Sequence, residues 1–258
     1  MKPVIGKIPF LNSFPFYSCW ENLPVKTVEL FPKQLGELAR EGKIDGGLLS
    51  LFDYFTVEDE FSALDLGIAA RGPVKSILLF TDCPLWDLSG KQMAVTDQTA
   101  TSFRLLRLIL EIKEKQTGLR YTTDFSEKTV GMLLIGNQAL AEKREKLRTY
   151  RYLYDLSEFW HHWTGLPFVF AVWAFRKTLP PAVVDKIKIQ LESSLEKSLA
   201  NLEKVAALGS EEMGSLEERT TYLSGIIYRL GPEEKKGLEL FKSALLRAKL
   251  LEEAGAVV

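Results

Sequence analysis

The stretch LPFVFAVWAF, residues 166–175, decides how we interpret the rest of the chain. It is too apolar and too aromatic for a surface element, so we interpret it as a buried strand. Alternating strand and helix signals precede it, and an all-helical region follows from Pro180 onward. A buried strand at this point predicts that the chain returns to a first sheet after it has built a second unit.

Strand and helix signals alternate through the first third of the chain. The segments 4–8, 25–31, 64–70 and 75–81 predict strands, and residues 43–55 predict a short buried strand that runs into a helix. A helix is expected from Pro32, which suits a first turn, to Gly42, which suits a helix stop. This order with short loops predicts an α/β fold with a largely parallel sheet.

A second α/β unit is expected downstream. Residues 91–96 predict a strand, residues 97–118 a helix, and residues 129–143 a buried strand followed by a turn and a helix. After Pro180 we expect three helices, within residues 180–209, 215–231 and 232–255, each with a glycine stop.

We therefore predict two lobes joined by two crossing strands, with residues 75–81 leaving the first lobe and residues 166–175 returning to it. The first lobe comprises residues 1–84 and 166–258, and the second comprises residues 85–165. A cleft between the lobes is the expected ligand site, because ligands favour clefts at domain interfaces.

The composition excludes several classes of protein. The 258 residues carry a formal net charge of −1 and no basic block, so we expect no nucleic-acid partner. No apolar run approaches the roughly 20 residues of a membrane span, and residues 1–10 do not resemble a signal peptide, so we expect a cytoplasmic protein without a membrane partner. Cys19 and Cys83 are expected to be unpaired thiols, and a zinc site is not expected.

Polar residues follow three of the predicted strands. Thr99, Thr101 and Ser102 crowd a helix start, where free N–H groups and the helix dipole favour an anion; simple N-capping is the alternative. Gly136 and Asn137 follow a buried strand at the edge where ligands sit in α/β sheets, although an ordinary turn would explain them too. These groups predict a site for a small anion.

For three further segments, a functional role is compared with a purely structural one. Ser76 begins a buried strand, and an isolated serine is usually structural. Asn12 and Ser13 interrupt the aromatic stretch VIGKIPFLNSFPFY, residues 4–17, most simply as a turn. The pair His161–His162 offers a general base in principle, but its aromatic surroundings favour a packing or surface role. We find no nucleotide-binding, nucleophile-elbow or zinc-protease motif, so the residues alone do not establish an enzyme.

Several segments together resemble the chorismate dehydratase family of the futalosine route to menaquinone. They are IGKIPFLNSFPFY (5–17), GKIDGGLLS (42–50), GPVKSILLF (72–80), DQTATS (97–102), LLIGNQAL (133–140) and DLSEFWHHWTGLPFVFAVW (155–173). The resemblance covers roughly residues 4–245, and its most specific part is WTGLPFVFAVW.

The resemblance implies a two-lobed fold of the type II periplasmic-binding-protein kind with an interdomain cleft and a helical C-terminal region. It also implies a carbon–oxygen lyase that converts chorismate to 3-[(1-carboxyvinyl)oxy]benzoate and water. No cofactor is expected, because aromatisation drives the reaction, and no metal is expected. Chorismate is the expected partner, and a homodimer is left open.

The resemblance also assigns residues. Asn12 and Ser76 are the expected catalytic residues, and Ser13, Ser50, Thr99, Thr101, Ser102, Gly136 and Asn137 are the expected substrate-binding residues. The chain departs from the family pattern at three places: Phe10 replaces a tyrosine, Asn137 stands where aspartate is common, and the family often has proline beside the position of Ser50.

Two alternatives stay open. One is 1,4-dihydroxy-6-naphthoate synthase, a sibling enzyme of the same pathway and fold, whose first strand is typically followed by a serine-proline-cysteine-proline-asparagine-aspartate pattern. This chain has IPFLNSFPF, residues 8–16, at that place, which favours the dehydratase. The other alternative is a non-catalytic cytoplasmic binding protein for a small carboxylate.

Overall fold

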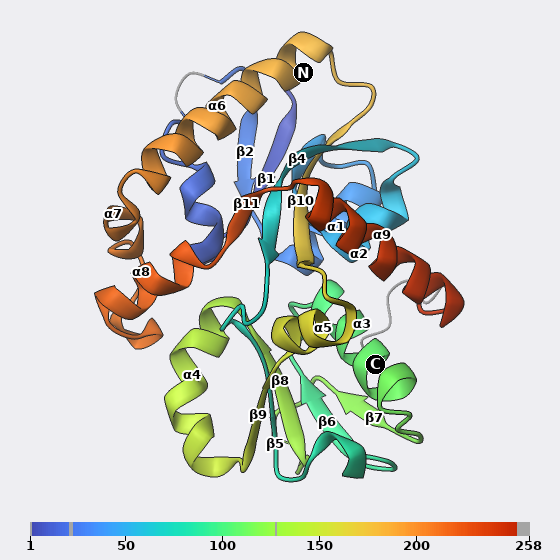
Figure 1. The fold of residues 1–258 in the computed structure, drawn as a ribbon. Helices are drawn as coiled ribbons and strands as arrows, with labels where there is room; N and C mark the ends of the chain where they lie inside the picture. The colour runs from blue at the N-terminus through green and yellow to red at the C-terminus, as the bar shows by residue number, and fades with distance from the viewer. Residues whose placement is uncertain (1, 21–22, 127, 252–258) are drawn as a thin grey trace. The chain divides into compact units, whose positions relative to one another are not determined.

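The computed structural model describes residues 2–20, 23–126 and 128–251. The chain forms two compact units (Figure 1): unit 1 contains residues 1–69 and 169–231, and unit 2 contains residues 70–168 and 232–258. The chain therefore passes between the units three times, whereas the sequence predicted two passages. The units also differ from the predicted lobes, because residues 70–84, 166–168 and 232–258 belong to unit 2.

Sheet A belongs to unit 1, and its strand order is β11-β4-β10-β3-β1-β2. Its strands are β1 (Val4–Lys7), β2 (Lys26–Glu29), β3 (Gly46–Ser50), β4 (Phe61–Ala70), β10 (Phe168–Arg176) and β11 (Ile227–Arg229). β1 pairs in parallel with β2 and β3, but β10 runs antiparallel to β3 and β11 antiparallel to β4. The sheet is therefore mixed, because β10, where the chain returns from unit 2, runs opposite to β3, and β11 runs opposite to β4; the prediction of a largely parallel sheet was wrong here.

The prediction of a buried strand at residues 166–175 is confirmed by β10. Residues 168–175 are all buried, and the strand lies between β4 and β3 inside sheet A. An internal strand that is covered on both faces needs apolar side chains at every position, which explains the unbroken apolar run.

Unit 1 has helices on both sides of sheet A (Figure 1). They are η1 (Leu11–Phe16), α1 (Pro32–Arg40), α2 (Leu51–Val57), α6 (Pro181–Leu199), α7 (Leu202–Ala206), η4 (Glu211–Met213) and α8 (Leu216–Ser224). α6 and α7 lie on one side of the sheet and α1 and α2 on the other, so the central strands are enclosed.

Two predictions for the region after Pro180 were wrong. The helix predicted over residues 180–209 breaks between α6 and α7, because the Asn201 side chain accepts the N–H of Lys204 and starts a new helix. The region is also not entirely helical, since β11 follows α8 and pairs with β4. The β11 residue Tyr228 is only 3% exposed, so burial in sheet A overrides the helical pattern of this segment.

Sheet B belongs to unit 2, and its strand order is β7-β6-β8-β5-β9. Its strands are β5 (Ile77–Thr81), β6 (Gln92–Val95), β7 (Arg120–Thr122), β8 (Gly131–Ile135) and β9 (Tyr152–Asp155). β6 pairs in parallel with β7 and β8, and β5 pairs antiparallel with β8 and β9, so this sheet is mixed too. Side chains of β5, β6 and β8 pack against Ala139 of α4 in a continuous core.

The helices of unit 2 are η2 (Leu85–Asp87), α3 (Thr101–Arg107), the π-helix η3 (Leu108–Lys113), α4 (Gly136–Thr149), α5 (Leu156–Thr164) and α9 (Pro232–Arg247). α9 belongs here because the Phe241 ring packs against two aromatic neighbours, with centroids 4.9 Å from Phe168 and 5.9 Å from Trp160. Gly237 brings the helix against the backbone of Pro167, where no Cβ would fit.

No helix in the described part of the chain combines the length and the apolar character that a membrane crossing requires. Cys19 and Cys83 are both free thiols, as predicted.

Candidate functional site

The predicted polar residues of unit 2 gather at one edge of sheet B, which we call edge B. The parallel strands β6 and β8 are in register at Val95 and Leu133, so their carboxyl ends lie at the same edge. β5 is antiparallel to β8, and its start lies at this edge because Ile77 pairs with Ile135. Edge B therefore carries the six predicted residues Ser76, Thr99, Thr101, Ser102, Gly136 and Asn137.

Ser76 and Gly136 are joined directly. The N–H of Gly136 donates to the carbonyl of Ser76 over 2.8 Å, which extends the pairing of β5 and β8 by one bond. Gly136 has φ +57°, a left-handed conformation that favours glycine, and it is the first residue of α4. Ser76 itself is only 1% exposed. The turn glycine and the strand-start serine thus form one local unit.

None of the predicted hydroxyl residues occupies the N-cap position of α3. The helix begins at Thr101, and its N-cap residue Ala100 makes no side-chain capping bond. Thr99, Thr101 and Ser102 are each 4% exposed or less. A side chain at the N-cap position therefore does not explain these hydroxyls, and the binding of a carboxylate at this helix start stays a prediction.

Asp155 also lies at edge B, and the sequence analysis missed it. It pairs with Leu78 across β5 and β9 and caps α5, where its Oδ1 accepts the N–H groups of Ser157 and Glu158 at 3.0 and 3.3 Å. Burial raises the pKa of the Asp155 carboxyl, and the surrounding backbone N–H groups oppose that rise. An aspartate followed three residues later by glutamate is a helix-start pattern that would have found it.

The predicted residues of unit 1 lie at the carboxyl edge of sheet A, which we call edge A. β1 and β3 are parallel, so η1 after β1 and Ser50 at the end of β3 lie at this edge. Asn12 and Ser13 are both in η1. Edge A thus brings together the three unit 1 residues that the resemblance selects.

The hydroxyl of Ser13 is used within the turn. Ser13 is fully buried, and its Oγ lies 2.5 Å from the carbonyl of Ile8 and 2.7 Å from that of Phe10, to which it donates. The Tyr17 hydroxyl accepts the N–H of Ile8 at 3.0 Å and supports the same turn. This geometry explains Ser13 as a residue that shapes η1, and its role as a substrate ligand stays a prediction.

Ser50 likewise has local partners. It caps α2: its Oγ accepts the N–H of Asp53 at 3.2 Å and donates to Asp53 Oδ2 at 2.7 Å. Asp53 also binds the Arg40 guanidinium, with 2.6 Å between Nη1 and Oδ1. The serine therefore belongs to a partly buried network that ties α2 to α1, and its substrate-binding role stays a prediction.

Asn12 differs from these two serines. It is half-buried, and its side-chain amide forms no hydrogen bond with any residue that the structure describes. Neighbouring Phe10 packs against Phe31, with ring centroids 6.0 Å apart. Of the predicted residues at edge A, Asn12 is therefore the one whose polar group is not committed to a protein partner.

Other candidate groups lie elsewhere. Within residues 2–20, 23–126 and 128–251, no group of three or more His, Cys, Asp and Glu side chains is arranged to hold a metal ion. His161 Nδ1 lies 3.3 Å from the carbonyl of Leu166 at the end of α5, which fits the packing role expected for it.

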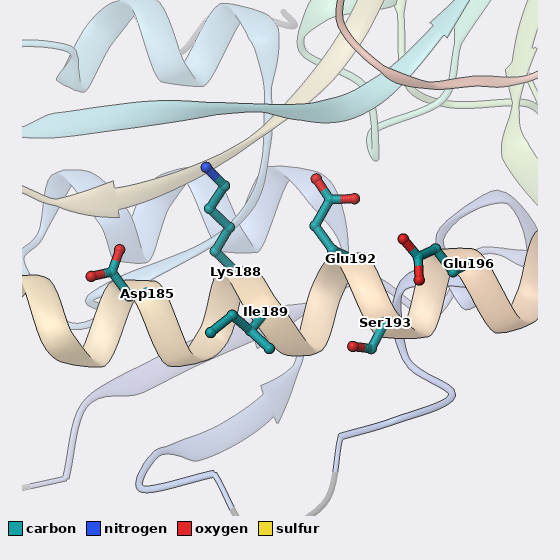
Figure 2. Close-up of a pocket in the computed structure, with 6 residues that line it drawn as sticks. All are labelled: Asp185, Lys188, Ile189, Glu192, Ser193 and Glu196. Carbon is teal, nitrogen blue, oxygen red and sulfur yellow. The ribbon is translucent and has the colours of Figure 1, made fainter.

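An open depression lies along the outer face of α6 (Figure 2). It is lined by Asp185, Lys188, Ile189, Glu192, Ser193 and Glu196. None of the predicted site residues lines it, and Figure 2 shows its side chains spread along a single helix rather than converging. The chemistry of the predicted site therefore does not depend on this surface.

A sequence model described as menaquinone biosynthesis matches residues 3–246. The chain belongs to this family. Within the menaquinone biosynthesis family, the chain is similar to the chorismate dehydratase of Thermus thermophilus, with 30% identity over 95% of this chain and 96% of that protein. The residues matched by the family model, 3–246, include both edges described above.

The fold has wider relatives. A protein from Archaeoglobus fulgidus superposes with a TM-score of 0.78 at 17% identity, covering 96% of this chain and 98% of that one. The periplasmic aliphatic sulphonate binding protein SsuA of Escherichia coli gives a TM-score of 0.67 at 12% identity, covering 98% and 89%. A Candida albicans protein with the generic periplasmic-binding-protein fold gives 0.66 at 9% identity, covering 97% and 95%. This member of the menaquinone biosynthesis family thus has the predicted periplasmic-binding-protein-like fold.

Proposed function

We propose that this chain is a chorismate dehydratase, a hydro-lyase that converts chorismate to 3-[(1-carboxyvinyl)oxy]benzoate and water. The observation that carries the proposal is the match to a chorismate dehydratase over 95% of this chain. The family match to menaquinone biosynthesis supports the same pathway context.

The chemistry of edge B supports an anionic substrate. Chorismate has two carboxylates, and edge B has hydroxyls and backbone N–H groups at the start of α3. Such groups bind carboxylates through charge-assisted hydrogen bonds. We assign Thr101 and Ser102 to a substrate carboxylate, with Thr99, Gly136 and Asn137 as further contacts.

The reaction breaks one C–H and one C–O bond. A proton leaves the carbon that bears the enolpyruvyl ether, its electron pair forms the new ring double bond, and hydroxide leaves the neighbouring carbon. Asn12 and Ser76 orient the substrate and assist the departing hydroxyl. Neither is a base near neutral pH, so the substrate's own side-chain carboxylate takes the proton when it is held over the ring.

The test is to incubate the purified chain with chorismate and follow the aromatic product by absorbance and mass. Enzyme-free samples correct for the pyruvate and prephenate that chorismate forms by itself. The proposal predicts the carboxyvinyloxybenzoate product; chorismate binding without turnover would instead identify a binding protein and refute the proposal.

Asn12→Ala tests the residue assignment. It should keep chorismate binding, measured by calorimetry, but lose at least about 10²-fold in kcat, as expected for removal of one preorganised polar group. Full activity of Asn12→Ala would overturn the assignment.

Asn201→Ala is the matched control, because it makes the same chemical change at an exposed position where the side-chain oxygen only caps α7. It should lower the free energy of unfolding by about 1 kcal/mol, as loss of an N-cap does, and leave kcat unchanged. A loss of kcat in Asn12→Ala that the control does not share is therefore a property of the site and not of reduced stability.

A further inference from the structure

The loop that carries Ser76 has an unusual backbone. It joins β4 to β5 and contains two residues in the left-handed region, Gly72 at φ +81° and Lys75 at φ +66°. Glycine accepts this conformation without a penalty, but lysine does not, because its Cβ crowds the backbone. Lys75 is exposed, so packing of its side chain does not hold it in place. Another contact must stabilise the backbone immediately before Ser76.

The carboxylate of Asp155 supplies that contact. Its Oδ2 accepts the N–H of Lys75 over 2.6 Å, which is the short distance of a charge-assisted bond. Its other oxygen, Oδ1, accepts the two N–H groups at the start of α5. The two oxygens therefore tie the strained loop to a helix end, and the strand pairing of Leu78 with Asp155 fixes the distance between them.

Ser76 is thus held from two directions. Its own carbonyl accepts the N–H of Gly136, on the side of β8 and α4. On the other side, Asp155 fixes the peptide group of the preceding residue. An asparagine at position 155 has only one acceptor oxygen, so it would satisfy either the loop or α5 but not both.

We propose that Asp155 is a positioning residue that holds Lys75 in its left-handed conformation and thereby places the Ser76 side chain for the reaction. This inference rests on the proposed function, in which Ser76 touches the substrate. In the part of the chain that the structure describes, the Asp155 carboxylate accepts its hydrogen bonds from backbone N–H groups, so we assign it a role through Ser76 rather than on chorismate.

The experiment combines two substitutions. Asp155→Asn should lower kcat for chorismate by up to about 10²-fold with a smaller change in KM, because small displacements of a reacting group have effects of this size. Lys75→Gly in the Asp155→Asn background should recover at least about tenfold of that loss, because glycine adopts φ +66° without help. Asp124→Asn is the matched control: Asp124 caps an exposed turn in unit 2, and kcat should not change.

A purely structural role for Asp155 predicts a different result. Asp155→Asn would then lower the melting temperature, leave the kcat of the folded enzyme unchanged, and gain nothing from Lys75→Gly. That result would overturn the proposal. If Asp155→Asn does not fold, Lys75→Val is a second variant, because a β-branched residue opposes φ > 0 and position 75 is exposed. Full kcat in Lys75→Val would also overturn the proposal.

Hydrogen exchange separates this proposal from the proposed function. Asp155→Asn should increase amide exchange in residues 74–77 by at least about tenfold, and Lys75→Gly should reverse most of the increase, whatever the substrate is. A wild-type chain that does not convert chorismate would refute the function alone. Unchanged exchange in Asp155→Asn would refute the role of Asp155.

Discussion

Gly237 provides a sharp test of how α9 docks on unit 2. A Cβ at this position would lie 2.2 Å from the carbonyl oxygen of Pro167, which is 1.2 Å inside the 3.4 Å at which ordinary contact begins. The obstacle is backbone, so it cannot move aside as a flexible side chain would. Gly237→Ala must therefore push α9 outward and loosen Phe241 from Trp160 and Phe168.

Two effects of Gly237→Ala oppose each other. Alanine in a helix interior is favoured over glycine by about 1 kcal/mol, whereas overpacking of this kind costs up to about 3 kcal/mol. We therefore expect the free energy of unfolding to fall by about 2 kcal/mol, because the steric term is larger than the propensity gain.

Urea unfolding followed by tryptophan fluorescence measures the change, since Trp160 is buried against Phe241. Ser243→Ala is the control, because Ser243 is exposed on the same helix and should gain a few tenths of a kcal/mol. If Gly237→Ala matched the control or exceeded wild type, the docking of α9 through Gly237 would be refuted.

Two further predictions concern buried polar groups. Asp53→Ala removes the carboxylate that accepts hydrogen bonds from both Ser50 and Arg40. In urea titrations it should lower the free energy of unfolding by about 2 kcal/mol, a value reduced for the partial exposure of Arg40. A loss below about 0.5 kcal/mol would contradict the network. Burial and the neighbouring Glu111 raise the pKa of Tyr121, so folding stabilises the neutral form of the phenol. The resulting contribution to the free energy of unfolding is fully present below about pH 10 and is lost as the pH rises further. Wild type should therefore lose more stability than Tyr121→Phe above about pH 10, and equal alkaline losses would count against this interpretation.

The sequence predicted the internal strands and the edge strand β2, but it missed the edge strands β7, β9 and β11. β10 and β5 are buried along almost their whole length, so their composition alone identifies them. β7, β9 and β11 have three or four residues each, and their pairing depends on partners that lie far away in the chain. A pattern of so few residues contains no period that distinguishes a strand from a loop.

The site residues also divide into those that the sequence could place and those whose partners it could not predict. Ser76 and Gly136 could be placed because both lie next to strongly apolar strands. Asp155 could not be linked to Ser76, because its partner Lys75 lies 80 positions away. Nor could the sequence show that the hydroxyls of Ser13 and Ser50 bind neighbouring groups, since this depends on backbone geometry within a single turn.

The three passages of the chain between the units have a consequence for biosynthesis. All strands of sheet B lie between residues 77 and 155, so they leave the ribosome as one continuous segment. Sheet A is incomplete until β10 and then β11, which ends at Arg229, have been made. The nascent chain therefore carries the N-terminal strands β1 to β4 for most of its synthesis with their central partner missing. Sheet A, which begins the sequence, is therefore completed after sheet B, and unit 2 in turn is completed only when α9 has been made.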